Sequence, residues 1–341
     1  MKVLTISVAA YNSAEYLDRC IRSFEESGVI DNLDIIIVND GSTDNTQEIA
    51  ESISKKHPDS VSVINKDNGG HGSTINTSIK IAKGKYYKIV DADDWVEPGG
   101  LKELVDLLKN ATSDIVSNPY YRVDAESDNK TIKYDSVDRN NIGQVIDIDS
   151  QDPDMLPAMH SLTFRTDVIR TNWKDLDEHC FYVDVEYLVY CFNNCSTILN
   201  LDFPVYDYLI GTSGQSINYR SLIKRRSEHE RVLWSCIKYS DESNLDKAGV
   251  RNRIIRNRIE EHILAQYKIF LSMSYIYSKK EISEFDSRLR EMSNLYYDEC
   301  VNNSTFEALR IPKVVSWLRK RHFKRYLPVN VMYRIRYGTL I

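Results

Sequence analysis

Residues 86–94 read Tyr-Tyr-Lys-Ile-Val-Asp-Ala-Asp-Asp. The aromatic and β-branched residues at the start of this stretch are typical of a buried strand, which we expect over 86–90. Three carboxylates then follow within four residues. Like charges this close repel one another, so a fold keeps them where a cation compensates them or where water solvates them. The stretch therefore predicts a strand ending in an acidic loop, which is either a site for Mg²⁺ or Mn²⁺ or a solvated turn.

Strands and helices alternate on both sides of this stretch. Short apolar runs predict strands, and apolar residues three and four apart predict helices. Ser13 is the expected N-cap of the first helix, and Asp44 opens a capping box for the second. The alternation predicts an α/β fold with a doubly wound, mostly parallel sheet. The expected strands are 3–8, 35–38, 61–64, 86–90 and 115–116, and the expected helices are 17–24, 46–53, 75–82 and 98–108.

Polar residues gather directly after four consecutive strands. In parallel sheets, ligands bind at the carboxyl ends of the strands, where these residues would meet. This position favours the cation site over the solvated turn for the acidic loop. The four clusters are Tyr11-Asn12, Asp40-Gly41-Ser42, Asn68-Gly69-Gly70-His71-Gly72 and Asp91-Ala92-Asp93-Asp94.

Taken singly, the residues of these clusters allow two interpretations each. Asp40 precedes a glycine, as in many turns, but it could equally accept a hydrogen bond from a base on which Tyr11 stacks. The glycines of 69–72 would let backbone N–H groups approach a phosphate, although they match neither GxxxxGK[ST] nor GxGxxG. His71 within them is most simply a loop histidine. Asp184 opens a helix expected over 184–192, where a carboxylate also favours the helix dipole.

The second half of the chain changes character. Residues 118–160 are polar and lack a helical period, so we expect irregular structure that lines an acceptor site, with one strand at 144–148. From about residue 221 apolar residues recur every fourth position, which predicts helices throughout. We therefore expect an α/β domain over 1–220 and a helical domain over 221–341.

The charge is distributed unevenly along the chain. The net charge is −6, yet residues 310–341 carry nine Lys and Arg and no Asp or Glu. The apolar residues of this tail, Trp317 among them, suit peripheral contact with an anionic membrane, or equally a helix packed on the acidic remainder. A nucleic-acid partner is not expected, because no recognised binding module accompanies the charge. The sequence leaves a homo-oligomer open.

The expected cellular compartment follows from two patterns that the sequence lacks, a membrane-spanning run and a signal peptide. No run approaches the roughly 18 apolar residues of a membrane-spanning helix, and the N-terminus shows no signal-peptide pattern. The six cysteines are scattered without a CxxC pair, as in reduced core thiols. We expect a cytoplasmic protein, held at the inner face of the membrane where the tail binds lipid.

Together these motifs resemble the family-two, inverting glycosyltransferases of GT-A fold, which in bacteria build cell-surface glycans or glycosylate adhesins. The resemblance covers about residues 1–215. Two departures stand out: Val183 replaces the usual Glu before the base, and Ile75 replaces the usual Arg of an Arg-Asn pair. The matching segments are 8–12, 15–17, 39–44, 68–69, 82–84, 91–94 and Pro98.

The resemblance implies a role for each matching residue. The nucleotide, usually uridine, would be held by Ala9, Tyr11, Asp40 and Asn68. Asp91 would face the ribose and the donor sugar, Asp93 would bind a Mn²⁺ or Mg²⁺ ion that bridges both phosphates, and Asp184 would be the general base. Gln215 would belong to a segment that closes over the donor near the diphosphate.

The implied reaction moves a hexose or N-acetylhexosamine from a UDP-sugar to a hydroxyl of a glycan, lipid-linked or glycoprotein acceptor. A dinucleotide-dependent oxidoreductase would need GxGxxG after the first strand, and a sugar-nucleotide pyrophosphorylase would need a Gly-rich, Arg-bearing loop there. The chain has neither, since its first glycine is Gly28. A non-catalytic protein that binds sugar nucleotides or glycans on the same fold stays open as the alternative.

Overall fold

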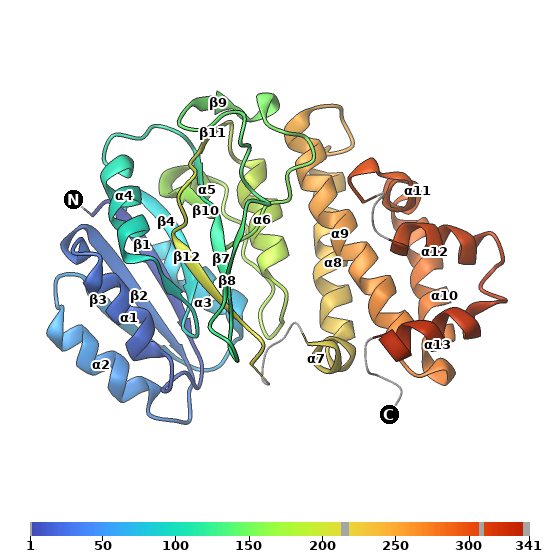
Figure 1. The fold of residues 1–341 in the computed structure, drawn as a ribbon, viewed down its shortest axis with the longest axis horizontal. Coiled ribbons are helices and arrows are strands. Elements are labelled where there is room, and N and C mark those ends of the chain that lie inside the picture. Colours follow the sequence, from blue (N-terminus) through green and yellow to red (C-terminus); the bar gives the residue numbers. More distant parts are fainter. Residues whose placement is uncertain (1, 213–217, 307–309, 337–341) are drawn as a thin grey trace. The chain divides into compact units, whose positions relative to one another are not determined.

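The computed structural model of the protein describes residues 2–212, 218–306 and 310–336. These residues form two compact units, which divide between residues 212 and 213 (Figure 1). The boundary predicted from the sequence, between residues 220 and 221, lies a few residues further along. The first unit is α/β and the second is helical.

An eight-stranded, mostly parallel sheet forms the centre of the first unit, as predicted. Its order is β3-β2-β1-β4-β10-β6-β11-β9, and the four N-terminal strands β3, β2, β1 and β4 are parallel to one another. Strands β10 and β9 run antiparallel to their neighbours. The strands are β1 (Leu4–Ala10), β2 (Leu33–Asp40), β3 (Val61–Lys66), β4 (Tyr86–Asp91), β6 (Ile115–Ser117), β9 (Val145–Asp147), β10 (Leu162–Arg165) and β11 (Thr197–Asn200).

Helices cover both faces of this sheet. Leu17, Phe24 and Leu104 belong to the core on the α1 and α4 side, and are fully buried. On the other face, Ser78 of α3 bonds with Ser7 of β1 at 2.7 Å. The helices are α1 (Leu17–Glu26), α2 (Thr46–Lys56), α3 (His71–Ile81), α4 (Pro98–Leu108), α5 (Thr166–Thr171) and α6 (Asp184–Asn193), with 3-10 turns η1 (Ile30–Asn32) and η2 (Ile148–Ser150).

The region expected to be irregular, residues 118–160, contributes the hairpin β7–β8 to a second sheet. This sheet has four strands in the order β5-β12-β7-β8 and lies beside the main sheet (Figure 1). The hairpin β7–β8 was not predicted, because its exposed face alternates polar residues that resemble a loop. The predicted strand at 144–148 is present as β9. The strands of this sheet are β5 (Trp95–Val96), β7 (Tyr120–Asp124), β8 (Lys130–Lys133) and β12 (Tyr206–Ile210).

Both predicted helix caps are wrong in detail. Tyr16 is the N-cap of α1 and Asn45 that of α2, and neither side chain accepts a capping hydrogen bond. Ser13 instead begins the turn before α1, where its carbonyl accepts from the N–H of Leu17. Asp44 accepts from the N–H of Thr46 and also from Ala14 at 3.1 Å. The side chain of Asp44 thus joins the loops after β1 and β2, which is a tertiary task that sequence spacing does not reveal.

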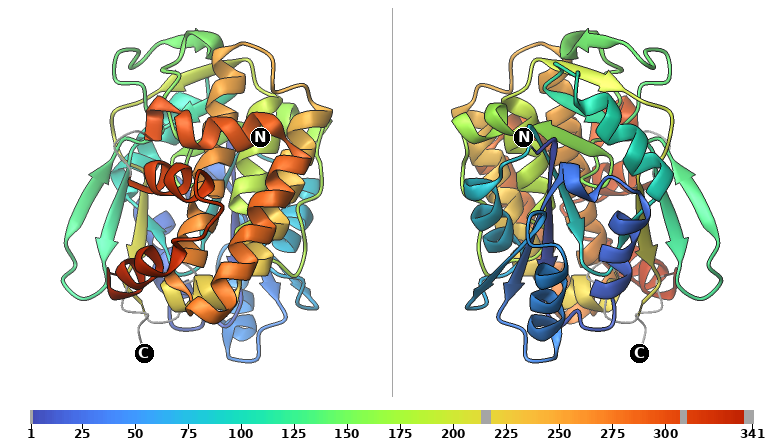
Figure 2. Two further views of the ribbon diagram at one scale, coloured as in Figure 1. Left: turned by 90° about the vertical axis from the view of Figure 1, so that its right-hand side faces the viewer. Right: turned by 90° about the vertical axis from the view of Figure 1, so that its left-hand side faces the viewer.

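The second unit consists of helices, as predicted, and the first of them begins at Tyr219 (Figure 2). The long α9 packs against α8, α10, α11, α12 and α13. Within the described residues, no helix is long and apolar enough to cross a membrane. The helices are α7 (Tyr219–Lys224), α8 (Arg226–Glu242), α9 (Val250–Ser272), α10 (Tyr275–Met292), α11 (Asn294–Asn302), η3 (Ser304–Phe306), α12 (Arg310–Arg319) and α13 (Tyr326–Arg336).

Two histidines stack inside the helical unit. The rings of His229 in α8 and His262 in α9 lie 3.5 Å apart and nearly parallel, and both residues are buried. Burial and the neighbouring ring hold the pKa of His229 well below its usual range. Burial lowers the pKa of His262 to about 3. The contact between α8 and α9 is therefore built on two neutral imidazoles.

This pair predicts a loss of stability in acid. An unfolded His262 takes up a proton below about pH 6.5, whereas the folded one resists it, so stability falls as the pH drops from 6.5 toward 3. Between pH 7.5 and 4.5 we expect the free energy of unfolding of the wild type to fall by about 3 kcal/mol more than that of His262→Gln, which stays neutral. Urea unfolding at both pH values measures this, and equal losses in the two proteins would contradict it.

Candidate active site

The predicted residues at the ends of β1 and β4 lie side by side. Ala9 pairs in register with Asp91, and its carbonyl accepts a hydrogen bond from Ala92 at 3.3 Å. Tyr11 follows at the end of β1, and its side chain is 54% exposed. A ring so exposed is available to stack on a planar ligand rather than fill the core, which was the alternative for this residue.

The carboxylate of Asp40 holds the loop after β3. Its Oδ1 accepts from Lys66 Nζ and from the N–H of Gly69, both at 2.9 Å, and its Oδ2 accepts from the N–H of Gly70 at 2.7 Å. Asn68 Nδ2 donates to the backbone carbonyl of Asp40 at 2.9 Å. Asp40 therefore has a structural task that the sequence did not reveal, and its binding of a base stays a prediction.

The glycines of 69–72 are explained by chain packing. A Cβ at Gly72 would collide with the carbonyl of Asp177, and one at Gly70 would lie 3.2 Å from the N–H nitrogens of His179 and Cys180. Gly70 also has a φ of +82°, which favours glycine. The carbonyl of Gly69 accepts a hydrogen bond from the N–H of His179 at 2.5 Å. The loop is thus glycine-rich because the chain crosses it, so its composition is no argument for a phosphate cradle.

The crossing segment leads directly into α6 and Asp184. Asn76 in α3 accepts from the N–H of Leu176 at 2.8 Å and donates to its carbonyl at 3.0 Å. The N–H of Asp177 donates to the buried Glu186 at 2.9 Å. These bonds fix the start of α6 next to α3. The negative charge of Asp184 at that position contributes to raising the pKa of His71.

His71 and Asp91 form the charged centre of the site. His71 Nε2 lies 3.2 Å from Asp91 Oδ1. Burial disfavours the imidazolium, but Asp91 and Asp184 outweigh it, so the pKa of His71 is raised. Burial likewise disfavours the Asp91 carboxylate, and His71 outweighs it, so the pKa of Asp91 is lowered. His71 therefore faces carboxylates that favour the protonated form of its ring, and its role stays a prediction.

The other two carboxylates of the acidic loop differ from each other. Burial and the charge of Asp91 raise the pKa of Asp93 to about 6. Asp94 is almost fully buried and accepts from Tyr206 Oη at 2.5 Å and from the N–H of Leu209 at 2.8 Å. Tyr206 Oη in turn accepts from the N–H of Asp91 at 3.2 Å. Asp94 thus joins the loop to β12 of the second sheet.

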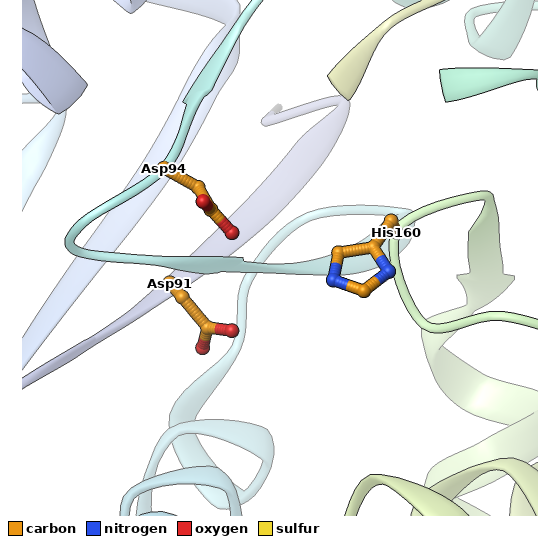
Figure 3. A group of neighbouring side chains, drawn as sticks. All are labelled: Asp91, Asp94 and His160. Atoms are coloured by element: carbon orange, nitrogen blue, oxygen red, sulfur yellow. The ribbon is translucent and has the colours of Figure 1, made fainter. Parts of the chain in front are cut away.

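Asp91, Asp94 and His160 can together hold a metal ion. One ligand atom from each lies within 4.8 Å of the other two. Figure 3 shows the two carboxylates turned toward the ring of His160, which comes from a different part of the chain. The buried Lys88 in β4 places this segment, since its ammonium group donates to the carbonyl of His160 at 2.8 Å. Asp93, the ligand implied by the resemblance, is not one of the three.

Comparison with known proteins agrees with this arrangement. Residues 5–188 match the family described as glycosyl transferase family 2. The chain belongs to this family. It is a member of the glycosyltransferases of GT-A fold.

Individual relatives share parts of the chain. Glycosyltransferase GlyG of Streptococcus pneumoniae is 34% identical over 128 residues, which cover 37% of this chain and 42% of GlyG. This chain spans less than half the length of the relatives it matches first.

Two solved structures share the fold over nearly the whole chain. Residues 1–349 of TarS from S. aureus, in complex with UDP-GlcNAc, have a TM-score of 0.67 at 16% identity and cover 98% of this chain and 92% of that one. The mannosyltransferase PcManGT from Pyrobaculum calidifontis, in complex with GDP-Man and Mn²⁺, has a TM-score of 0.54 at 15% identity, covering 97% and 86%.

Some residues of the candidate site could not be predicted from the sequence. His160 stands alone in a polar stretch without a ligand-like spacing, and Lys66 and Tyr206 look like ordinary strand residues. Gln215, which was predicted to lie near the diphosphate, falls outside the described residues. A useful signal was present for Tyr206, because tyrosines at 206 and 208 alternate as on one face of a strand.

The link between Asp94 and Tyr206 predicts a stability effect. Tyr206→Phe removes the hydroxyl that satisfies a buried carboxylate, so we expect it to lower the free energy of unfolding by about 1–3 kcal/mol. The matched control is Tyr208→Phe on the same strand, for which we expect less than about 0.5 kcal/mol. Urea unfolding compares the two, and equal losses would mean that the Tyr206 hydroxyl contributes little.

Proposed function

We propose that the protein is an inverting transferase that moves a hexose or N-acetylhexosamine from a UDP-sugar to a hydroxyl of a glycan, lipid-linked or glycoprotein acceptor. The observation that carries this is the meeting of Asp91, His71 and Asp184, from β4, α3 and α6, at one edge of the sheet. The UDP-GlcNAc complex of TarS, which shares the fold, supports UDP as the nucleotide.

The nucleotide would lie across the ends of β1, β2 and β3. Tyr11 would stack on the base, because its ring is exposed there, and Ala9, Asp40 and Asn68 would complete the pocket. Asp40 would bind the base by exchanging one of its present donors, of which Lys66 is the one on a flexible side chain. Asp91 would face the ribose and donor sugar, and Gln215 would close over the diphosphate.

A divalent ion, Mn²⁺ or Mg²⁺, fits the acidic loop. Burial and the charge of Asp91 raise the pKa of Asp93, and oxygen ligands suit these ions. Asp93 would hold the ion, beside the group formed by Asp91, Asp94 and His160. Asp94 is a poorer ligand, since both of its oxygens already accept hydrogen bonds. When bound, such an ion stabilises negative charge on the departing diphosphate.

Asp184 would take the proton from the attacking hydroxyl of the acceptor. Its place at the start of α6 is held by the contacts of 176–177 with α3 and Glu186, so the carboxylate is positioned before the acceptor binds. His71, on α3, would face the negative charge that develops on the departing diphosphate, from the side opposite Asp184 on α6. One displacement at the anomeric carbon inverts its configuration, so an α-linked donor would give a β-linked product.

Replacing the proposed base tests the mechanism. We expect Asp184→Asn to reduce turnover by about 10²- to 10⁴-fold, or roughly 3–5 kcal/mol, because general-base catalysis is lost. Asp175→Asn is the matched control: this carboxylate lies in the same segment, is 61% exposed and pairs with Lys80 at 3.3 Å. Release of UDP from a panel of UDP-sugars, with and without acceptors, is the assay. Unchanged turnover would remove Asp184 from the mechanism.

Nucleotide binding should survive this substitution. Ligand at 100 times its dissociation constant adds about 2.7 kcal/mol of stability, so UDP with Mn²⁺ should raise the melting temperature of both the wild type and Asp184→Asn by several degrees. EDTA should remove the shift, and GDP, CDP and NAD should give smaller ones. If no nucleotide shifts the wild type, the proposed donor site is wrong.

Residues 310–336 of the basic tail form helices, and only part of their apolar surface is exposed and able to contact a membrane. Val315, Leu318, Phe323 and Tyr326 are buried within the helical unit, so these predicted membrane contacts belong to the core. One side of α13 is exposed instead, and carries Leu327, Val331, Met332 and Ile335, which are 37–63% exposed. Cations flank it, at Lys324, Arg325, Arg334 and Arg336. We propose that the protein is cytoplasmic and that α13 lies on the inner face of the membrane.

Flotation with vesicles tests this surface. We expect the wild type to float with vesicles containing about 30% anionic lipid and not with neutral ones, since each nearby cation contributes about 1 kcal/mol. Val331→Ser/Ile335→Ser should lose this binding. Ile276→Ser, which alters an apolar residue that is 78% exposed on α10, is the control and should float like the wild type. No binding of the wild type to anionic vesicles would contradict the proposal.

A further inference from the structure

One face of the second sheet extends away from the acidic site. The register of β12 with β7 pairs Tyr206 with Tyr120, Tyr208 with Arg122, and Ile210 with Asp124. Side chains two residues apart point to the same face of a strand, so these pairs form three successive rows. β8 extends the rows, because Lys133 pairs with Tyr120 and Thr131 pairs with Arg122.

The first rows border the reacting centre. The ring of His160 stacks on Tyr208 at 4.2 Å and on Tyr120 at 5.2 Å, and it meets the edge of Tyr206 at 4.8 Å. His160 also has a ring nitrogen within 4.8 Å of carboxylate oxygens of Asp91 and Asp94, so these tyrosines lie close to the acidic loop. A ligand that leaves the acidic site across this sheet, from β12 toward β8, therefore passes the tyrosines of β12 first and then Arg122 and Lys133.

A polar cavity of about 370 Å³ lies over β7, β8 and the turn between them. Its lining includes Arg122, Asp124, Ser127, Asn129, Thr131 and Lys133. The volume is that of a small-molecule site, and most of the lining groups can donate hydrogen bonds.

The charge of this cavity is positive. Arg122 and Lys133 form no ion pair with any residue that the structure describes, and Arg122 is exposed. The one carboxylate, Asp124, is engaged by the turn that follows it: its Oδ1 accepts from Ser127 Oγ at 2.8 Å and from the N–H of Ser127 at 2.9 Å. Two unpaired cations thus face a cavity whose single anion already has partners.

We propose that this face is an acceptor subsite for an anionic saccharide, a sugar unit bearing a carboxylate or a phosphate. Arg122 presents a planar fork that matches either group, and Lys133 adds a second cation one row away. The tyrosines of β12, Tyr206 and Tyr208, would carry the sugar unit that receives the transfer. This inference rests on the proposed function, whose acceptor class it names.

Direct binding of oligosaccharides tests the subsite without turnover. The probes are a hyaluronan hexasaccharide with carboxylates, a glycerol-phosphate hexamer with phosphodiesters, and neutral chitohexaose, each measured by calorimetry with UDP and Mn²⁺ present. We expect one anionic probe to bind at least tenfold more tightly than chitohexaose, and its affinity to fall with added salt. Which anionic probe binds tells carboxylate from phosphate. Equal or weaker binding of both anionic probes than of chitohexaose would overturn the proposal.

Substitutions of Arg122 and Lys133 test where the anionic probe binds. Arg122→Gln/Lys133→Gln should weaken the anionic probe at least tenfold, and the charge-retaining Arg122→Lys/Lys133→Arg should recover part of the loss. Arg22→Gln/Lys55→Gln, which removes exposed cations from α1 and α2, is the matched control and should bind like the wild type. Undiminished binding by the glutamine pair, with an unfolding midpoint like that of the wild type, would place the anion elsewhere and overturn the subsite.

The two proposals fail in different ways. If the wild type releases no UDP from any UDP-sugar, the proposed function is wrong, whatever the oligosaccharides do. If it releases UDP but prefers neutral chitohexaose, the function stands and the anionic subsite is wrong.

Discussion

The side-chain amide of Asn76 holds the two halves of the active site together. It bonds both backbone groups of Leu176, one hundred residues away, much as a neighbouring strand would. Both bonds are buried, so water cannot readily replace either. Because Leu176 is held beside α3, the chain after it must cross the glycines of 69–72 and enter α6 at Asp184. A residue of α3 thereby sets the position of Asp184, the proposed base.

Two buried carboxylates likewise hold separate segments of the candidate site together. Asp40 holds the loop after β3 through Lys66 and two backbone N–H groups, and Asp94 holds β12 through Tyr206 and the N–H of Leu209. A buried carboxylate is costly unless hydrogen bonds satisfy it, and both are satisfied. Residues of the family motif thus hold the backbone of the site in place, in addition to the ligand contacts proposed for them. A substitution at either would change the shape of the site together with its chemistry.

The parts of the structure that could be predicted are those with a local cause. The parallel strands β1 to β4 follow from apolar runs, and the clustering of Asp91 with the other polar ends follows from their shared edge. The rest depends on distant partners. The glycines of 69–72 are explained only by the chain that crosses them at 177–180. His160 enters the site because Lys88 holds its backbone, which no spacing could indicate.

The three carboxylates of the acidic loop lie close together in the sequence, but each has a different environment in the structure. Asp94 is satisfied by hydrogen bonds and joins the two sheets. Asp91 is held ionised by His71, 3.2 Å away. Asp93 keeps a pKa of about 6, because burial and Asp91 disfavour its charge more than Arg19 and His71 support it. Burial and the neighbouring carboxylates raise the pKa of Asp94 as well, but hydrogen bonds already engage both of its oxygens. Asp93 is therefore the carboxyl of raised pKa that is best suited to a bound cation.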